Sequence, residues 1–234
     1  MLYLRQRYDV TWAMTSNYAF DTYTKERRGT LGPLVYIVTL KCASRFFTTA
    51  LAQSGWTWLG RQTVKDIDWD RSVVFGHIRD PIERRHRAVL QYIRYLKLQE
   101  QYLADTRLQQ LLAVATRLDR HGYTYNDMYG DMAWKVDWIP MWHGHNKTVS
   151  LTEKFLIRHR VDIPEWIGPV NETTSPSDKK IVNLLKQHWS SRLVPGPDFE
   201  YTAQIYAQDQ ELCNAVIKRF DHNADDWIHA SWLR

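Results

Sequence analysis

The chain is poor in cysteine and lacks a long apolar run. Its two cysteines, Cys42 and Cys213, are too few for a disulfide framework, and neither lies in the paired Cys/His spacing of a zinc site. No window approaches the roughly 18 uninterrupted apolar residues of a membrane-spanning helix. The N-terminus lacks the apolar core of a signal peptide. We therefore expect a cytoplasmic protein in a reducing compartment, with no bound metal and no membrane partner.

The sequence also lacks internal repeats, low-complexity segments and runs of like charge. Thirty-one Lys and Arg residues against 26 Asp and Glu residues give a formal net charge of +5, which suits an anionic ligand but is too small to indicate nucleic-acid binding. With 234 residues, 44% of them hydrophobic, the chain is long enough for one sizeable core. We expect one domain over residues 1–234, with a cover segment at 1–33 and a tail at 220–234.

Residues 34–51 predict a buried strand, a tight turn and a helix. Leu34 to Leu40 is an almost continuous apolar run, typical of a strand buried on both faces of a parallel sheet. A turn with small residues follows, and apolar side chains then recur at helical spacing. Backbone amides at such a helix N-terminus, beside Lys41 and the hydroxyl of Ser44, predict a site for phosphate or sulfate. Similar turns also occur in α/β proteins that bind no ligand there.

A second strand followed by a helix is predicted from residue 72 onward. Ser72 to Ile78 has strand length, Asp80 is a suitable helix N-cap, and Pro81 suits a first helical turn. Glu83 completes a start similar to a capping box. Arg79 falls at the carboxyl end of the strand, the edge where open α/β sheets bind ligands. On the predicted helix we expect four arginines to project away from the buried face, at positions 84, 85, 87 and 94.

The remaining elements are predicted from periodicity and turn residues. We expect short strands at 56–59 and 148–151, and helices at 103–118, from 152 onward, at 177–192 and at 199–219. Residues 1–30 are expected to form a helix or loop over the core, and residues 126–146 an irregular segment. The predicted class is α/β, with a central, mainly parallel sheet flanked by helices and a helix-rich C-terminal half.

Two strand-ending anion sites in this order resemble the sulfotransferase superfamily, which transfers the sulfuryl group of 3′-phosphoadenosine 5′-phosphosulfate (PAPS), and within it the carbohydrate-type branch. Lys41-Cys42-Ala43-Ser44-Arg45 is similar to the segment that cradles the 5′-phosphosulfate. Arg79-Asp80-Pro81-Ile82-Glu83-Arg84 is similar to the motif that holds the 3′-phosphate. Weaker landmarks at 137–140, 171–173 and 206–209 extend the resemblance over about residues 34–215. It implies a P-loop-like three-layer sandwich.

The resemblance also implies roles for individual residues. Lys41 would stabilise charge on the leaving group, with 3′-phosphoadenosine 5′-phosphate (PAP) as product and no metal required. The implied cofactor-binding residues are Lys41, Cys42, Ala43, Ser44, Arg45, Phe46, Phe47, Arg79 and Arg87. Arg87 stands where the family usually has Ser, Leu40 where it has Pro, and Asp137 where it has His. Asp137 is the first candidate for the general base, with His77, Asp66, Asp68 and Asp70 left open.

Other functions remain open at this point. A small P-loop kinase has the same arrangement of strand, turn and helix. Its loop requires glycines and a lysine near the end of the loop, whereas here the turn contains no glycine and Lys41 is its first residue. A basic nucleic-acid-binding protein and an inactive sulfotransferase fold are further alternatives. The acceptor is left open as a hydroxyl or an amine. Three tryptophans suggest a flat or sugar-like acceptor surface, at positions 134, 138 and 142. His143 and His145 are interpreted as part of a surface turn.

Overall fold

The protein is an α/β structure built on a five-stranded mixed sheet. The computed structural model describes residues 18–29, 32–81, 83–85, 87–88, 91, 122–141, 144–166 and 197–221, and in the last range the side chains of 207–219. The strand order is β3-β1-β2-β4-β5. The strands are β1 (Phe20–Lys25), β2 (Leu34–Ile37), β3 (Thr57–Gln62), β4 (Val73–Ile78) and β5 (Asp137–Pro140).

The sheet is mixed: two of its four strand pairings are parallel and two are antiparallel. Strands β2, β4 and β5 run parallel to one another, whereas β1 is antiparallel to both β2 and β3. Strand β1 lies in the segment that was expected to be a helix or loop, and that prediction was wrong for residues 20–25. Phe20 and Thr22 are buried at period two between more exposed neighbours, which is the pattern of a strand with one covered face.

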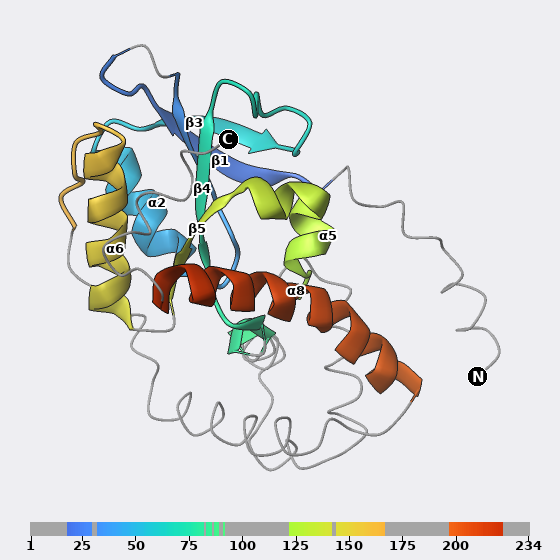
Figure 1. Cartoon of the computed structure of the whole chain (residues 1–234). Helices are drawn as coiled ribbons and strands as arrows, with labels where there is room; N and C mark the ends of the chain where they lie inside the picture. The colour runs from blue at the N-terminus through green and yellow to red at the C-terminus, as the bar shows by residue number, and fades with distance from the viewer. Residues whose placement is uncertain are drawn as a thin grey trace.

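Helices cover both faces of the sheet. Helices α2 (Ser44–Gln53) and α6 (His145–Arg158) lie on one face, and α5 (Tyr125–Tyr129) and α8 (Pro197–Asp221) lie on the other (Figure 1). The short helix η2 (Gly130–Lys135) follows α5 and leads into β5. After β2 and α2 the chain continues into β3, which lies on one side of the β2/β4 pair. After β4 it continues into β5, which lies on the other side.

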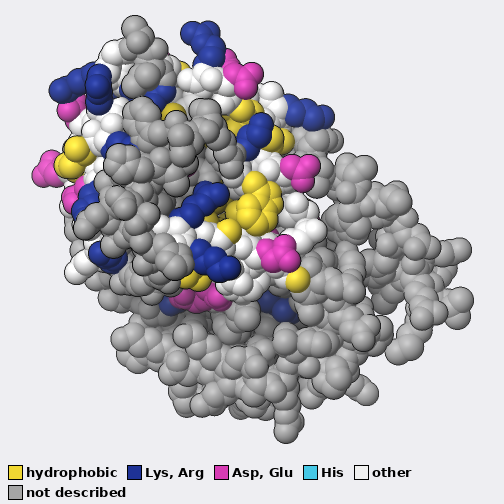
Figure 2. Space-filling model, viewed as in Figure 1, with side chains coloured by type: hydrophobic (Ala, Val, Ile, Leu, Met, Phe, Trp, Pro, Cys, Tyr) yellow, Lys and Arg dark blue, Asp and Glu magenta, His cyan; other side chains and the backbone are white. Residues whose placement is uncertain are grey.

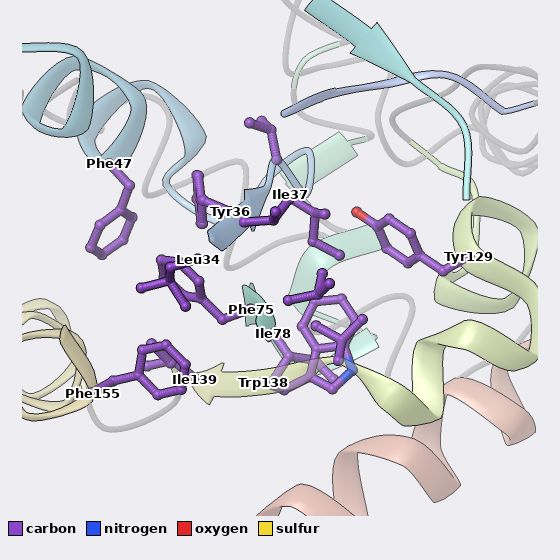
Figure 3. Packing of buried hydrophobic residues seen from close by; sticks show 14 of the residues in the cluster. Leu34, Tyr36, Ile37, Phe47, Phe75, Ile78, Tyr129, Trp138, Ile139 and Phe155 are labelled. Carbon is purple, nitrogen blue, oxygen red and sulfur yellow. The ribbon is translucent and has the colours of Figure 1, made fainter. Parts of the chain in front are cut away.

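The core has two halves, one on each face (Figure 3). On the α2 and α6 face, the ring of Phe75 lies 4.8 Å from that of Phe155, centroid to centroid. On the other face, the Trp138 ring lies 5.4 Å from Tyr125 and 5.6 Å from Tyr129. Consecutive residues of each central strand therefore serve opposite core halves, which is why β2 is buried along its whole length.

Gly76 is required by the close approach of β4 to Trp138. A Cβ atom at this position would lie 2.9 Å from Trp138 Cζ3 and 3.0 Å from Ile37 Cγ1. The indole is itself held in place, because its Nε1 donates a hydrogen bond of 2.7 Å to the carbonyl of Ala133. The glycine thus allows a large aromatic ring to lie flat against the central strands.

Several predicted elements are confirmed and one more is wrong. The strands predicted at 34–40, 56–59 and 72–78 correspond to β2, β3 and β4, and the helix predicted at 199–219 corresponds to α8. The strand predicted at 148–151 lies inside α6. Thr148 and Thr152 are accommodated there because each hydroxyl donates to the carbonyl four residues earlier, at 2.9 and 2.8 Å. The helices predicted at 103–118 and 177–192 lie outside the described residues.

The segment expected to be irregular is structured. Residues 126–146 contain most of α5, then η2 and β5, and the first residues of α6. Thr124 begins α5 with a capping box, in which its hydroxyl accepts from the Asp127 amide and the Asp127 carboxylate accepts from the Thr124 amide. This start was present in the sequence as a Thr followed three residues later by an Asp.

Candidate functional site

The turn after β2 has an unusual backbone for a segment without glycine. Lys41 and Ala43 both adopt the left-handed conformation, with φ of 67° and 52°, and Cys42 between them is fully buried. Helix α2 then begins at Ser44, and within the described residues no side chain caps its N-terminus. The first-turn amides of a helix have no partner inside the helix itself. This end of α2 is therefore suited to an anion.

Arg79 comes directly after β4, at the same edge of the sheet. Asp80 caps the helix that begins at Pro81, because its Oδ1 accepts from the Glu83 amide at 2.9 Å. The Glu83 carboxylate accepts from Arg79 Nη1 at 2.7 Å and lies 3.7 Å from Arg87 Nη2. The two arginines predicted to bind one phosphate are thus brought together around one acid.

The two predicted anion-binding segments are joined by direct contacts. The Tyr125 hydroxyl bonds to both the amide nitrogen and the carbonyl oxygen of Arg79, and it lies 3.6 Å from Cys42 Sγ. Lys41 Nζ donates to Gln91 Oε1 at 2.8 Å, which connects the turn to the segment after β4. The chain leaves β2 and β4 in opposite directions, so their carboxyl ends form a topological switch point, the usual ligand position in open α/β sheets.

Arg84 is buried under this site, contrary to the expectation that it projects from the helix. Only 1% of the residue is exposed, and its guanidinium lies 4.7 Å from the centre of the Tyr125 ring. It donates to the Tyr123 carbonyl and lies 3.8 Å from Asp209 Oδ2. The segments around residues 79–84 and 206–209, which carry two of the sequence motifs, are therefore joined by one buried ion pair between Arg84 and Asp209.

The Asp209 carboxylate is bound by backbone amides as well as by Arg84. It accepts from the Tyr125 amide at 2.8 Å and from the Asn126 amide at 3.4 Å, at the start of α5. Burial raises the pKa of Asp209 to about 7, although Arg84 and the two amides act in the opposite direction. Asp209 therefore fixes α5, and with it Tyr125, against α8.

His77 is enclosed in the core on the α2 and α6 face. Its ring stacks on Phe47 with centroids 3.6 Å apart, and its nitrogens lie 3.1 Å from the Tyr36 hydroxyl and 3.0 Å from Thr152 Oγ1. Burial lowers the pKa of His77 to about 3, so the ring is neutral at physiological pH. The structure does not bring His77 to the open edge near Lys41.

Asp137, the first candidate for the general base, lies away from the turn. It pairs with Phe75, whereas Pro140, three residues further along β5, pairs with the last residue of β4. At about 3.3 Å per residue, Asp137 is roughly 10 Å short of the carboxyl edge. It interacts electrostatically with Arg158 at the end of α6: burial lowers the pKa of Arg158, and Asp137 opposes that shift.

Two of the three acids in the loop after β3 accept hydrogen bonds within that loop. Asp66 accepts from the amide and hydroxyl of Thr63, at 2.7 and 2.9 Å, and these bonds lower its pKa. Asp68 accepts from the Arg71 amide at 3.2 Å. Asp70 is exposed. The contacts of Asp66 and Asp68 are typical of acids that close turns.

His145, which the sequence analysis assigned to a surface turn, lies beside the first turn of α2. It is the first residue of α6, it is exposed, and its ring lies 4.5 Å from that of Phe46 in the first turn of α2. The Trp166 ring stacks on the Phe46 ring, with centroids 5.8 Å apart and an angle of 13° between the ring planes. The available signal was its position just after β5, where a parallel strand ends at the ligand edge.

Of the three tryptophans predicted to form an acceptor surface, the two that the structure describes differ in exposure. Trp138 is buried in the core, whereas Trp134 is 44% exposed. Trp142 lies outside the described residues. The described residues contain no cluster of three or more His, Cys, Asp or Glu side chains suited to a metal ion. In the view of Figure 2, the basic side chains that the structure describes are interspersed with acidic ones.

Comparisons of the chain with protein-family models, curated proteins and solved structures found no match. In the described part of the chain, no helix has the length and apolar character needed to cross a membrane.

Proposed function

We propose that the protein is a PAPS-dependent sulfotransferase with a P-loop-like three-layer fold, acting on a hydroxyl or amine, with a carbohydrate as one acceptor class. The observation that supports this most is the joining of two anion-binding segments by one residue. Tyr125 contacts Cys42 in the Lys41 turn and the backbone of Arg79. A ligand recognised here carries two separated anionic groups, as PAPS does.

The residues present fit such a ligand. The N-terminus of α2 has no side-chain cap among the described residues, and its amides suit a phosphate. Arg79 Nε is buried and has no hydrogen-bond partner in the described part of the chain. A buried guanidinium nitrogen of this kind is suited to an additional acceptor from a ligand. The segment from Lys41 to Phe47 would hold the 5′ end, and Arg79 with Arg87 the 3′-phosphate.

Sulfuryl transfer requires mainly that the reacting groups are aligned and that developing charge is stabilised, as in phosphoryl transfer. When bound, PAPS supplies an activated sulfuryl group. Lys41 Nζ would stabilise negative charge at the leaving oxygen, and the amides of the α2 N-terminus would orient the phosphate. Arg79 would distinguish a nucleotide that carries a 3′-phosphate from one that does not, since a guanidinium binds phosphate through two parallel hydrogen bonds.

We assign the general base to His145 in preference to Asp137. The exposed imidazole lies beside the first turn of α2, whereas Asp137 lies three residues before the end of β5. A base must be within hydrogen-bond reach of the proton that it accepts. At this edge, His145 would take the proton of an acceptor hydroxyl at a ring nitrogen.

Thermal-shift measurements with PAP, 5′-AMP, ATP and no ligand test the cofactor assignment. We expect PAP to raise the melting temperature much more than equal concentrations of AMP or ATP, because a ligand of the native state stabilises it by mass action. The Arg79→Ala variant should lose most of the preference for PAP over AMP, and Arg61→Ala on β3 serves as a matched control. A larger shift with ATP than with PAP would favour the kinase, and equal shifts with PAP and AMP would overturn the role of Arg79.

A further inference from the structure

A hollow of about 880 Å³ lies on the molecule far from the proposed cofactor site. It is formed by the connection after β1 and the turn after α6, and its lining includes Arg28, Arg160 and Ile163. Strand β1 ends at Lys25, which pairs with Leu34, the first residue of β2. The hollow is therefore at the amino edge of the parallel strands, whereas the Lys41 turn follows their carboxyl edge.

Arg160 is held at the hollow by a strained backbone. Helix α6 ends with hydrogen bonds from Arg160 N to Ile157 O at 2.9 Å and from Val161 N to Leu156 O at 3.0 Å. Arg160 has φ of 57°, at a position after a helix where glycine is the usual residue. The Arg28 amide bonds to the Arg160 carbonyl at 3.5 Å, which connects the two walls. A residue other than glycine in this conformation supports the hypothesis that its side chain has a function.

Two more arginines, Arg27 and Arg158, lie close to the lining residues in the chain, each with an acid nearby, Glu26 and Asp137 respectively. Arg27 Nη1 lies 3.4 Å from His159 Nδ1. Burial, together with the charges of Arg27 and Arg158, lowers the pKa of His159 to about 4. The acid in the lining is Asp162, which pairs with Arg28 at 2.6 Å while both side chains are about three-quarters exposed, at 74% and 75%. Such a surface pair is weak and can be exchanged for a ligand carboxylate.

Two large aliphatic side chains belong to the same lining. Ile157 is 59% exposed and Ile163 is 45% exposed. An inorganic anion or a sulfated sugar gains little from such groups, because it has little apolar surface to bury. A peptide that carries carboxylates next to an apolar side chain matches both features, since guanidinium groups bind carboxylates in a fork geometry.

We propose that this hollow docks an acidic segment of a partner protein, in which carboxylates flank an aliphatic or aromatic side chain. The carboxylates bind Arg28 and Arg160, and the apolar side chain packs on Ile157 and Ile163. Asp162 competes with the ligand for Arg28. This docking surface is independent of the proposed sulfotransferase activity and lies at the other edge of the sheet.

Fluorescence anisotropy with the full chain tests the proposal. The probe is a labelled peptide Glu-Asp-Leu-Asp-Phe-Glu, and the controls are a peptide with Gln and Asn in place of the acids and one with Ala in place of Leu and Phe. We expect Arg28→Ala and Arg160→Gly each to weaken binding of the acidic peptide about tenfold, the loss of one charge-assisted hydrogen bond. Asp162→Asn should tighten binding, and Arg61→Ala should leave it unchanged.

The variants separate loss of binding from loss of folding. Arg160→Gly places glycine in a left-handed position, so its melting temperature should not fall. Unchanged affinity in both arginine variants, or no tightening of binding in Asp162→Asn, would overturn the site. Equal affinity for the Ala-substituted peptide, or competition by a heparin-derived oligosaccharide at the same concentration, would show an anion site without the peptide specificity that we propose.

Discussion

The Tyr125 hydroxyl lies 2.9 Å from both the amide nitrogen and the carbonyl oxygen of Arg79. It accepts from the first and donates to the second, so one buried side chain satisfies both backbone groups of the residue that follows β4. Because the same hydroxyl contacts Cys42, its position sets the spacing between the two segments of the candidate site.

Tyr125→Phe should therefore destabilise the protein and weaken ligand binding together. The Arg79 amide loses its partner and the Arg79 carbonyl keeps only the contact with Cys213 Sγ at 3.6 Å, which costs about 1–3 kcal/mol. Urea denaturation measures the loss, and the PAP-induced thermal shift should decrease in parallel. Tyr129→Phe is the control, because the Tyr129 hydroxyl contacts the Thr39 hydroxyl at 2.9 Å rather than Arg79. An equal reduction of the PAP shift in both variants would contradict the role of Tyr125.

Lys41 and Arg79 should respond differently to substitution. Lys41→Ala should reduce turnover about 100-fold or more with a smaller effect on PAP affinity, because Lys41 acts on charge that develops during reaction. Arg79→Ala should instead weaken PAP binding about tenfold or more. Steady-state kinetics and calorimetry with PAP separate the two effects. Loss of affinity without loss of turnover in Lys41→Ala would assign that lysine to binding alone.

The two candidates for the general base are separated by their effects on turnover. His145→Gln should lower turnover by about 100-fold or more. Asp137→Asn should leave turnover unchanged, since Asp137 does not reach the carboxyl edge. The opposite pair of results would restore Asp137. Unchanged PAP-induced thermal shifts in both variants would show that the cofactor site is intact.

Gly76→Ala should destabilise the protein by about 1–3 kcal/mol, the usual cost of overpacking a core. The new methyl group meets the far edge of the Trp138 ring at 2.9 Å. Denaturation of Trp138→Phe and of the double variant completes the test. The loss caused by Gly76→Ala should be smaller when Trp138 is Phe, because the clashing carbon is absent. Strict additivity would mean that the strain arises at Ile37 instead.

Asp209 should make stability rise as the pH falls. Its pKa of about 7 in the native protein exceeds the ordinary 3.8, so the native state binds more protons between these values. The contribution is lost as pH rises, by up to about 1.4 kcal/mol per pH unit. The difference in unfolding free energy between the wild type and Asp209→Asn should therefore fall from pH 5 to pH 7.5. Asp162→Asn is the exposed control, and the same slope there would contradict the assignment.

Local signals were sufficient for the strand-turn-helix units of the fold. Leu34 to Leu51 and Ser72 to Pro81 contain their own hydrophobic runs, turn residues and caps. Strand β1 was missed because its burial depends on pairing with β2 and β3 rather than on its composition. Helix α6 was misassigned at Thr148 because β-branched residues favour strands until a carbonyl of the preceding turn accepts their hydroxyl.

The candidate site residues likewise divide into those that the local sequence predicts and those that depend on tertiary contacts. The Lys41 turn and Arg79 could be found because each follows its own strand directly. Asp137 was placed at the site by motif position, and the register of β5 against β4 shows that it is not at the strand end. His145 could be recognised only after the start of α6 and its contact with Phe46 were known. Burial of Arg84 depends on Asp209, which is 125 positions later in the sequence.

The left-handed residues of the turn after β2 have a kinetic consequence. A glycine-rich loop samples many shapes and closes around its ligand, but L-residues such as Lys41 and Ala43 adopt positive φ at a cost of about 1–2 kcal/mol each. The fully buried Cys42 side chain keeps them there. We therefore expect the site to be formed before any encounter, and ligand association to proceed in one phase at a rate set by diffusion and charge rather than by loop rearrangement.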